Sequence, residues 1–250
     1  MLVLAAGSAL HASPIELLEA GAGAGFDAVG LRLSGERALP AFQLSAIRKR
    51  ADDLGMRIHD VEVHRVGVDT DARPLIEACA LLGAPFLLVV SDLADEGATI
   101  DALASVADSA AKSGVAIGLE YMAWTTPKTA IGAVRIAHAA LCKIVVDVLH
   151  HHRNGGGPSE LRTVVDAGLL GWVQLCDAPF GAPPDLLHEA RHARLIPGHG
   201  ALPLSALIAE IPRETTISVE VQSDELATNA ATHEVALVLA NATRQMLLDR

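Results

Sequence analysis

The stretch VVDVLHHHRNGGG, residues 145–157, decides how the chain folds. A short apolar run ends at an acidic residue, Asp147, and three glycines at 155–157 then give the backbone freedom to turn into another element. This order is typical of a buried parallel strand that ends in a polar loop, with a helix starting near Pro158 or Ser159. The question is whether the rest of the chain repeats it.

Short apolar runs alternate with amphipathic runs along the whole sequence. Ser13, followed by a proline, is typical of a helix start, and Gly55, Gly83 and Gly114 are typical of helix ends. No linker divides the chain, and about eight strand–helix units fit its length, so we expect an α/β protein with one (β/α)8 TIM-barrel domain over residues 1–250. An open doubly wound sheet is the alternative. The expected strands are Leu2–Ala5, Ala28–Leu33, Arg57–Val63, Phe86–Val90, Ala116–Tyr121, Ile144–Leu149, Trp172–Cys176 and Thr216–Val221.

Composition and charge exclude several classes of partner. The formal net charge of −11 repels phosphate backbones and anionic lipid, so we expect neither a nucleic acid nor a membrane as partner. No apolar stretch approaches the length of a membrane span. Cys79, Cys142 and Cys176 lack metal-binding spacing, and the first residues lack the basic start of a signal peptide. These features predict a cytoplasmic protein with buried thiols.

Four polar side chains lie near the ends of the last four expected strands, namely Glu120 in VAIGLEYM, Asp147 in KIVVDVLHHH, Gln174 in GWVQLCD and Glu220 in TISVEVQ. Positions 120, 147 and 174 are evenly spaced, which places equivalent side chains around one rim of a barrel. A buried carboxylate is costly unless it is paired or binds a metal. Four oxygen donors favour one divalent cation, Mg²⁺ or Mn²⁺, with Co²⁺ or Zn²⁺ as alternatives. The competing explanation is that these acids only form ion pairs with nearby basic residues, Arg153, Arg194 or Lys143.

His150 follows Asp147 by one turn of chain, where the expected strand ends. That position suits a hydrogen bond to a substrate oxygen or a proton transfer. His151 and His152 are expected to be solvated loop residues. The segment FGAPPDLLHEARHARLIPGHG, residues 180–200, is predicted to be a long loop that can cover the site.

These motifs resemble the xylose isomerase-like barrel superfamily of sugar phosphate isomerases and epimerases. The group also includes inosose dehydratase, 3-dehydroshikimate dehydratase and the AP endonucleases. The resemblance is carried by GLEYM (118–122), VVDVLHHHRNG (145–155), VQLCDAP (173–179), RLIPGHG (194–200), LPLSALI (202–208) and SVEV (218–221), and in the first half by HDVEVHRV (59–66).

The resemblance implies roles for individual residues. It implies a metal bound by Glu120, Asp147, Gln174 and Glu220. It also implies that Glu120 and Glu220 flank the reacting carbon, and that His150 and Arg194 hold the oxygens of the substrate. Epimerases of the superfamily usually have a histidine at the third ligand position, and Gln174 is more similar to the dehydratase branches. The familial PGEG loop reads PGHG here, with His199 in place of the acid.

Two further substrate-binding residues are predicted from their positions, Glu62 at the end of the third strand and Arg153 after the sixth. A structural ion pair is the alternative for Glu62. The low aromatic content and the apolar stripe of Leu237–Leu248 are compatible with a homo-oligomer, although packing in the core explains the stripe equally well.

The expected function is a metal-dependent isomerase or epimerase that abstracts the proton next to the carbonyl group of a sugar or related polyhydroxy compound. The alternative is a metal-dependent dehydratase, a lyase that acts on a cyclic polyhydroxy ketone such as an inosose or 3-dehydroshikimate. A DNA-repair phosphodiesterase is disfavoured by the acidic charge. A third reading is a non-catalytic binding subunit that keeps the barrel without the chemistry.

Overall fold

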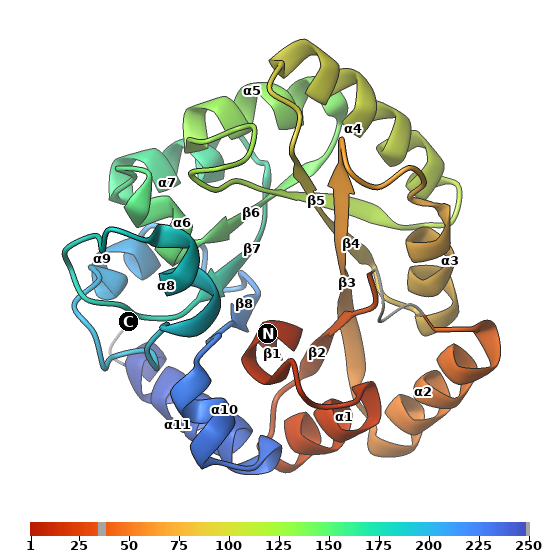
Figure 1. The fold of residues 1–250 in the computed structure, drawn as a ribbon, viewed down its shortest axis with the longest axis vertical. Helices are drawn as coiled ribbons and strands as arrows, with labels where there is room; N and C mark the ends of the chain where they lie inside the picture. Colours follow the sequence, from red (N-terminus) through yellow and green to blue (C-terminus); the bar gives the residue numbers. More distant parts are fainter. Residues whose placement is uncertain (35–38, 249–250) are drawn as a thin grey trace.

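Parallel strands close into a barrel in chain order, with β1 hydrogen-bonded to both β2 and β8 (Figure 1). The computed structural model describes residues 1–34 and 39–248. The closed order confirms the predicted (β/α)8 barrel and excludes the open sheet. The strands are β1 (Leu2–Leu4), β2 (Ala28–Arg32), β3 (Arg57–Val66), β4 (Phe86–Ser91), β5 (Ala116–Glu120), β6 (Lys143–Asp147), β7 (Leu170–Leu175) and β8 (Ile217–Val219).

The helices form a ring around the strands (Figure 1). A capping box at Ser13 starts α1, and Gly55 and Gly83 end α2 and α3 in the left-handed conformation, as predicted. Helix α4 ends at Ala111 with Lys112 as its C-cap, and Gly114, also left-handed, lies in the turn that closes the helix. The helices are η1 (Ala6–Ala9), α1 (Pro14–Gly23), α2 (Ala41–Leu54), α3 (Arg73–Leu82), α4 (Glu96–Ala111), α5 (Ala130–Ala140), α6 (Val148–Arg153), α7 (Pro158–Asp166), α8 (Leu186–His192), α9 (Leu204–Ala209), α10 (Asp224–Asn229) and α11 (Thr232–Leu248).

Two strand ends differ from the prediction in ways that affect the site. Strand β6 ends at Asp147 and not at Leu149, because the Asp147 carboxylate accepts the backbone N–H groups of Leu149 and His150 and so caps helix α6. Strand β3 continues to Val66, so Glu62 lies within the strand and not at its end.

The interior of the barrel below the rim is mostly apolar, and the buried His59 ring packs there against Phe86 and Trp172. A cluster separate from the main core contains Val63, Leu88, Val90, Met122, Val145 and Trp172. The Trp172 ring lies over Gly118, where a Cβ atom would overlap it. The larger core joins the strands to the surrounding helices. Below its rim, the barrel is therefore a packed core and not a channel.

Helix α11 packs against α1 and β8 with one face, whose buried residues include Val235 and Leu239. Leu237 and Val238 of the same helix are exposed. Packing in the core thus explains part of the apolar stripe, and the homo-oligomer stays a prediction. Among the described residues, no helix is long and apolar enough to cross a membrane.

Candidate active site

The four predicted ligands lie at the carboxyl ends of adjacent strands. Glu120 ends β5, Asp147 ends β6, Gln174 lies near the end of β7, and Glu220 directly follows β8. The register pairs Asp147 with Gln174 across β6 and β7. All four side chains are buried. The even spacing in the sequence thus brings these side chains to one rim, although the register pairs Glu120 with Val145 and not with Asp147.

Arg194 lies within this group of acids. Its Nη1 donates to Asp147 Oδ2 at 2.6 Å and lies 3.3 Å from Glu220 Oε2, and its Nε donates to the Ala190 carbonyl at 2.7 Å. The guanidinium group is buried, with only 3% of the residue exposed. The ion-pair explanation of the acids therefore holds for two of them.

One buried arginine does not balance the charge of the site. Burial raises the pKa of Glu120 well above its usual range, and Glu220 and Asp147 raise it further. Burial also raises the pKa of Glu62 to about 8 and raises that of Glu220. Burial of Asp147 acts in the same direction, but the charge of Arg194 and the hydrogen bonds that the carboxylate accepts from Arg194 and from the His150 N–H outweigh it and lower the pKa to about 2. The arrangement is one that a further cation would stabilise.

His150 lies in the first turn of α6, where Asp147 caps the helix. Its Nε2 is 3.8 Å from Glu120 Oε1, and its ring meets that of Trp124 edge to face with centroids 5.2 Å apart. Burial lowers the pKa of His150 to about 4, so the imidazole is neutral at pH 7. Ligand atoms of Glu120, Asp147 and His150 lie within 4.8 Å of one another, close enough to hold one metal ion.

Gln174 provides an independent test of whether the site fits a metal. Its side-chain oxygen is buried and has no hydrogen-bond partner among the described residues. Buried polar atoms are nearly always partnered, and an unpartnered amide oxygen beside carboxylates is a suitable ligand for a hard divalent cation. The residues present therefore fit the predicted metal, although its identity stays a prediction.

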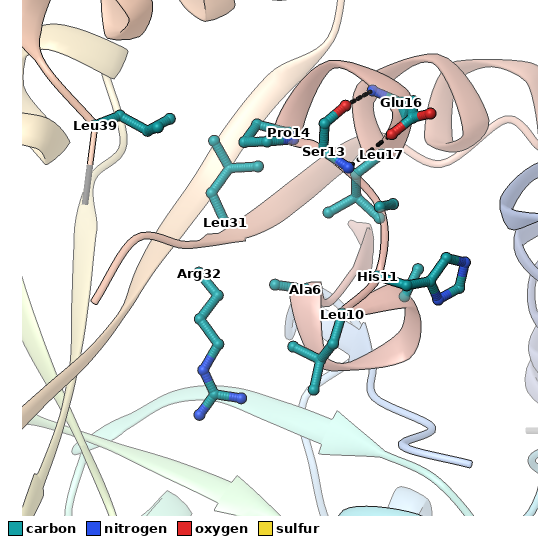
Figure 2. Close-up of a pocket in the computed structure, with 12 residues that line it drawn as sticks. Ala6, Leu10, His11, Ser13, Pro14, Glu16, Leu17, Leu31, Arg32 and Leu39 are labelled. Carbon is teal, nitrogen blue, oxygen red and sulfur yellow. Dashed lines mark hydrogen bonds between the residues drawn. The ribbon is translucent and has the colours of Figure 1, made fainter. Parts of the chain in front are cut away.

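A cavity of about 420 Å³ opens above these acids. This volume lies within the range of small-molecule sites. Five residues predicted to act in the site line it, namely Glu62, Glu120, His150, Arg194 and Glu220. A neighbouring cavity of about 370 Å³ shares Leu10 and Arg32 with it and includes the Ser13–Glu16 capping box (Figure 2).

Arg153 does not line either cavity. Its side chain is buried and forms a two-bond ion pair with Glu189 of α8, with both N···O distances at 2.7 Å. It also donates to the carbonyl groups of Pro179 and Phe180. The structure thus places Arg153 where it ties α6 to the β7–α8 loop, and not where it was predicted to bind substrate.

Two further predictions about this region are wrong. His151 is buried, not solvated. Its Nδ1 is hydrogen-bonded to Tyr121 Oη at 2.7 Å, and its Nε2 is hydrogen-bonded to the Gly157 carbonyl oxygen at 2.9 Å. Residues 180–200 are not only a loop, because they contain helix α8, which Asp185 caps through the His188 N–H.

Sequence reasoning missed Asp177, which organises the segment after Arg194. Its buried carboxylate accepts the N–H groups of Ala178, Gly198, Gly200 and Leu202 at 2.8–3.1 Å. Its backbone pairs with Leu195, next to Arg194 in the chain. The signal was present, since an acid follows the apolar end of β7 in VQLCDAP.

A second omission is Arg32, which interrupts the apolar run AVGLRL much as Glu120 interrupts VAIGLEYM. It lines the cavity together with Arg65, Trp124 and Arg191, none of which was predicted. The same reasoning that selected Glu120 would have selected Arg32, had it been applied to basic residues.

A closed barrel that gathers buried acids and a cavity at the carboxyl ends of its strands has the architecture of a (β/α)8-barrel enzyme site. Residues 18–242 match the family described as xylose isomerase-like TIM barrel. The chain belongs to this family, which confirms the resemblance seen in its motifs.

Curated relatives of the chain are enzymes. It is 30% identical over 215 residues to 3-dehydroshikimate dehydratase of Pseudomonas putida, an alignment that covers 78% of this chain and 33% of that protein. The corresponding enzyme of Pseudomonas aeruginosa is also 30% identical, over 217 residues, with the same coverage. The chain therefore spans about a third of the length of these relatives.

Solved structures share the fold. A fusion protein of a xylose isomerase-like TIM barrel and a 4-hydroxyphenylpyruvate dioxygenase is 27% identical, with a TM-score of 0.79 over 97% of this chain and 41% of that one. The IOLI protein, solved with a zinc atom, is 18% identical with a TM-score of 0.83, covering 99% of this chain and 98% of that one. D-psicose 3-epimerase of Clostridium cellulolyticum is 14% identical, with a TM-score of 0.76 and coverage of 98% and 97%.

Proposed function

We propose that the chain is a divalent-metal-dependent dehydratase that removes water from a cyclic polyhydroxy ketone of the 3-dehydroshikimate type. The observation that carries the proposal is Gln174, a buried amide oxygen without a partner in the described structure, at the rim with three acids. The activity of the relatives at 30% identity supports dehydration over the isomerisation first expected from the sequence.

The metal would be held by Glu120, Asp147, Gln174 and Glu220, although among the described residues it is His150, and not Glu220, that has a ligand atom within 4.8 Å of those of Glu120 and Asp147. When bound, the ion supplies a Lewis acid that acidifies the C–H bond next to the substrate carbonyl and stabilises the negative charge that develops. Arg194 donates to the Asp147 carboxylate and to the Glu220 backbone carbonyl and lies at ion-pair distance from the Glu220 carboxylate, so its guanidinium group is positioned to donate to an oxygen of the substrate as well. His150 is buried beside them as a neutral imidazole and can either donate or accept a hydrogen bond.

The reaction requires a base that removes a proton from carbon and an acid that delivers a proton to the leaving hydroxyl group. The carboxylate of Glu220 or Glu120 takes the proton from the carbon next to the carbonyl, the electron pair forms a C=C bond, and the hydroxyl group on the following carbon leaves. The proton held by the carboxyl group accompanies the hydroxyl, so one molecule of water is released. With 3-dehydroshikimate, a further proton shift within the ring gives 3,4-dihydroxybenzoate.

The test is to dialyse the protein against a chelator and reload it separately with Mg²⁺, Mn²⁺, Co²⁺ or Zn²⁺. Each form is then incubated with 3-dehydroshikimate, an inosose and a set of ketoses in D₂O. Proton NMR follows exchange at the carbon next to the carbonyl and the appearance of a dehydrated product. Glu220→Gln is expected to abolish both, while Glu210→Gln, which removes a surface acid paired with Arg162, leaves them unchanged.

The outcomes separate the three functions expected from the sequence. Metal-dependent loss of water supports the proposal. Exchange with formation of an epimer or isomer, and no loss of water, would replace it by the isomerase. Failure to bind any metal near one equivalent would instead favour a binding subunit.

A further inference from the structure

Arginines line the cavity together with its acids. Four of the nineteen basic residues of the chain line it, and all four are arginines, namely Arg32, Arg65, Arg191 and Arg194. Arg194 is occupied by the acids, and Arg65 donates to Asp92 at 2.7 Å. Within the described structure, Arg32 and Arg191 form neither a hydrogen bond nor an ion pair.

The two unpaired arginines come from different elements. Arg32 ends β2, is half-buried and pairs in register with Glu62 of β3. Figure 2 shows its side chain extended, with the guanidinium group turned away from Ser13 and Glu16, the polar residues of the neighbouring cavity. Arg191 is exposed on α8. The cavity thus combines carboxyl groups with two guanidinium groups that no hydrogen bond holds among the described residues, and the charge of one of them, Arg32, acts on Glu62 and Glu220.

The charges around the cavity determine whether an anionic ligand can enter it. Glu62, Glu120 and Glu220 line the cavity, and the chain as a whole carries a net charge of −11. An anion would therefore be repelled unless cations met it at the entrance. A neutral polyol needs no such cations, whereas a planar guanidinium group matches the geometry of a carboxylate in two parallel hydrogen bonds.

We propose that Arg32 and Arg191 bind a carboxylate group carried by the substrate and make the site selective for carboxylated ketones over neutral ones. The inference rests on the proposed dehydratase function and specifies its substrate class. The competing explanation is that Arg32 only offsets the nearby acids Glu62 and Glu220. In that case its loss would weaken binding of an anionic ligand only slightly, because no ligand group contacts it and only a long-range attraction screened by salt is lost.

The experiment compares two matched ligands on the metal-loaded protein. 3,4-Dihydroxybenzoate and its neutral amide, 3,4-dihydroxybenzamide, share the ring and both hydroxyl groups and differ in the charged group. Isothermal titration calorimetry measures the Kd of each for the parent protein, for Arg32→Gln and for Arg191→Gln. The matched control is Arg73→Gln, which removes an exposed arginine of α3 that is paired with Asp71 outside the cavity.

We expect the parent protein to prefer the acid, and either cavity substitution to weaken binding of the acid by about ten- to hundredfold while leaving the amide unchanged. Arg73→Gln should change neither. The proposal is overturned if the parent protein binds neither ligand or does not distinguish them, or if Arg32→Gln weakens both equally or weakens binding of the acid only slightly or not at all.

These results are separable from those on the reaction itself. Preference for the acid without metal-dependent loss of water from 3-dehydroshikimate would support carboxylate recognition and refute the dehydratase. Loss of water without any preference for the acid would support the dehydratase and refute carboxylate recognition.

Discussion

Replacing Asp177 by asparagine tests how the segment after Arg194 is held. Asp177 Oδ1 accepts the N–H groups of Ala178 and Leu202, and Oδ2 accepts those of Gly198 and Gly200. Asparagine has nearly the same shape but only one accepting oxygen. Whichever way its amide group is oriented, two backbone N–H groups then face an NH₂ group that cannot accept from them.

The expected cost follows from these two lost bonds. A hydrogen bond to a charged group contributes about 1.5–3 kcal/mol, so the loss of two costs about 3–6 kcal/mol. Gly198 and Gly200 are exposed, and water can replace part of what they lose, which favours the lower end. A loss of about 3 kcal/mol corresponds to a melting temperature lower by about 6–12 °C for a domain of this size.

Thermal and urea unfolding, followed by circular dichroism, measure the effect. The matched control is Asp185→Asn, at a carboxylate that, among the described residues, accepts only the His188 N–H as the N-cap of α8. Asparagine caps helices as well as aspartate, so the control should stay within about 0.5 kcal/mol of the parent protein. An Asp177→Asn protein as stable as this control would refute the view that the carboxylate organises the segment.

Three other predictions test the barrel and its supports. Gly118→Ala should lower the free energy of unfolding by about 1–3 kcal/mol because its Cβ overlaps Trp172, whereas Gly23→Ala, with open space around it, should not lower it. Urea unfolding compares them, and equal stability would contradict the packing argument. Arg153→Met should cost about 3–5 kcal/mol by leaving Glu189 buried and unpaired, and the double replacement of both residues by methionine should recover most of it in the same assay. The three cysteines are buried, and burial raises the pKa of each thiol, so Ellman's reagent should label them only after denaturation, and rapid labelling of the native protein would contradict their burial.

The floor of the site could be predicted from the sequence because its signal is local. A carboxylate or amide in an apolar strand is conspicuous, and parallel strands of a closed barrel bring their carboxyl ends together. Glu120, Asp147, Gln174 and Glu220 are therefore found at one rim, as the spacing predicted. Their roles as ligands stay predictions.

The surroundings of the site were harder to predict because their contacts join distant segments. Arg153 was assigned to the substrate because it follows the strand that contains Asp147, but its acceptor, Glu189, lies on a later helix. His151 was expected in solvent, but its partner Tyr121 comes from the preceding strand–helix unit. A single sequence shows which polar residues need partners, not which partners they find.

In the proposed function, the acids at the strand ends and the arginines of the later segment serve different steps, since the acids bind an ion or move a proton and the arginines bind the substrate. The acids on the strand ends are held by backbone register, so they can bind an ion or move a proton without depending on loop conformation. Arg191 and Arg194 instead depend on the segment that Glu189 and Asp177 anchor. Changes in that segment can therefore alter which substrates are bound while the floor stays intact. Asp177→Asn, which leaves the strands untouched, should accordingly weaken ligand binding more than metal binding.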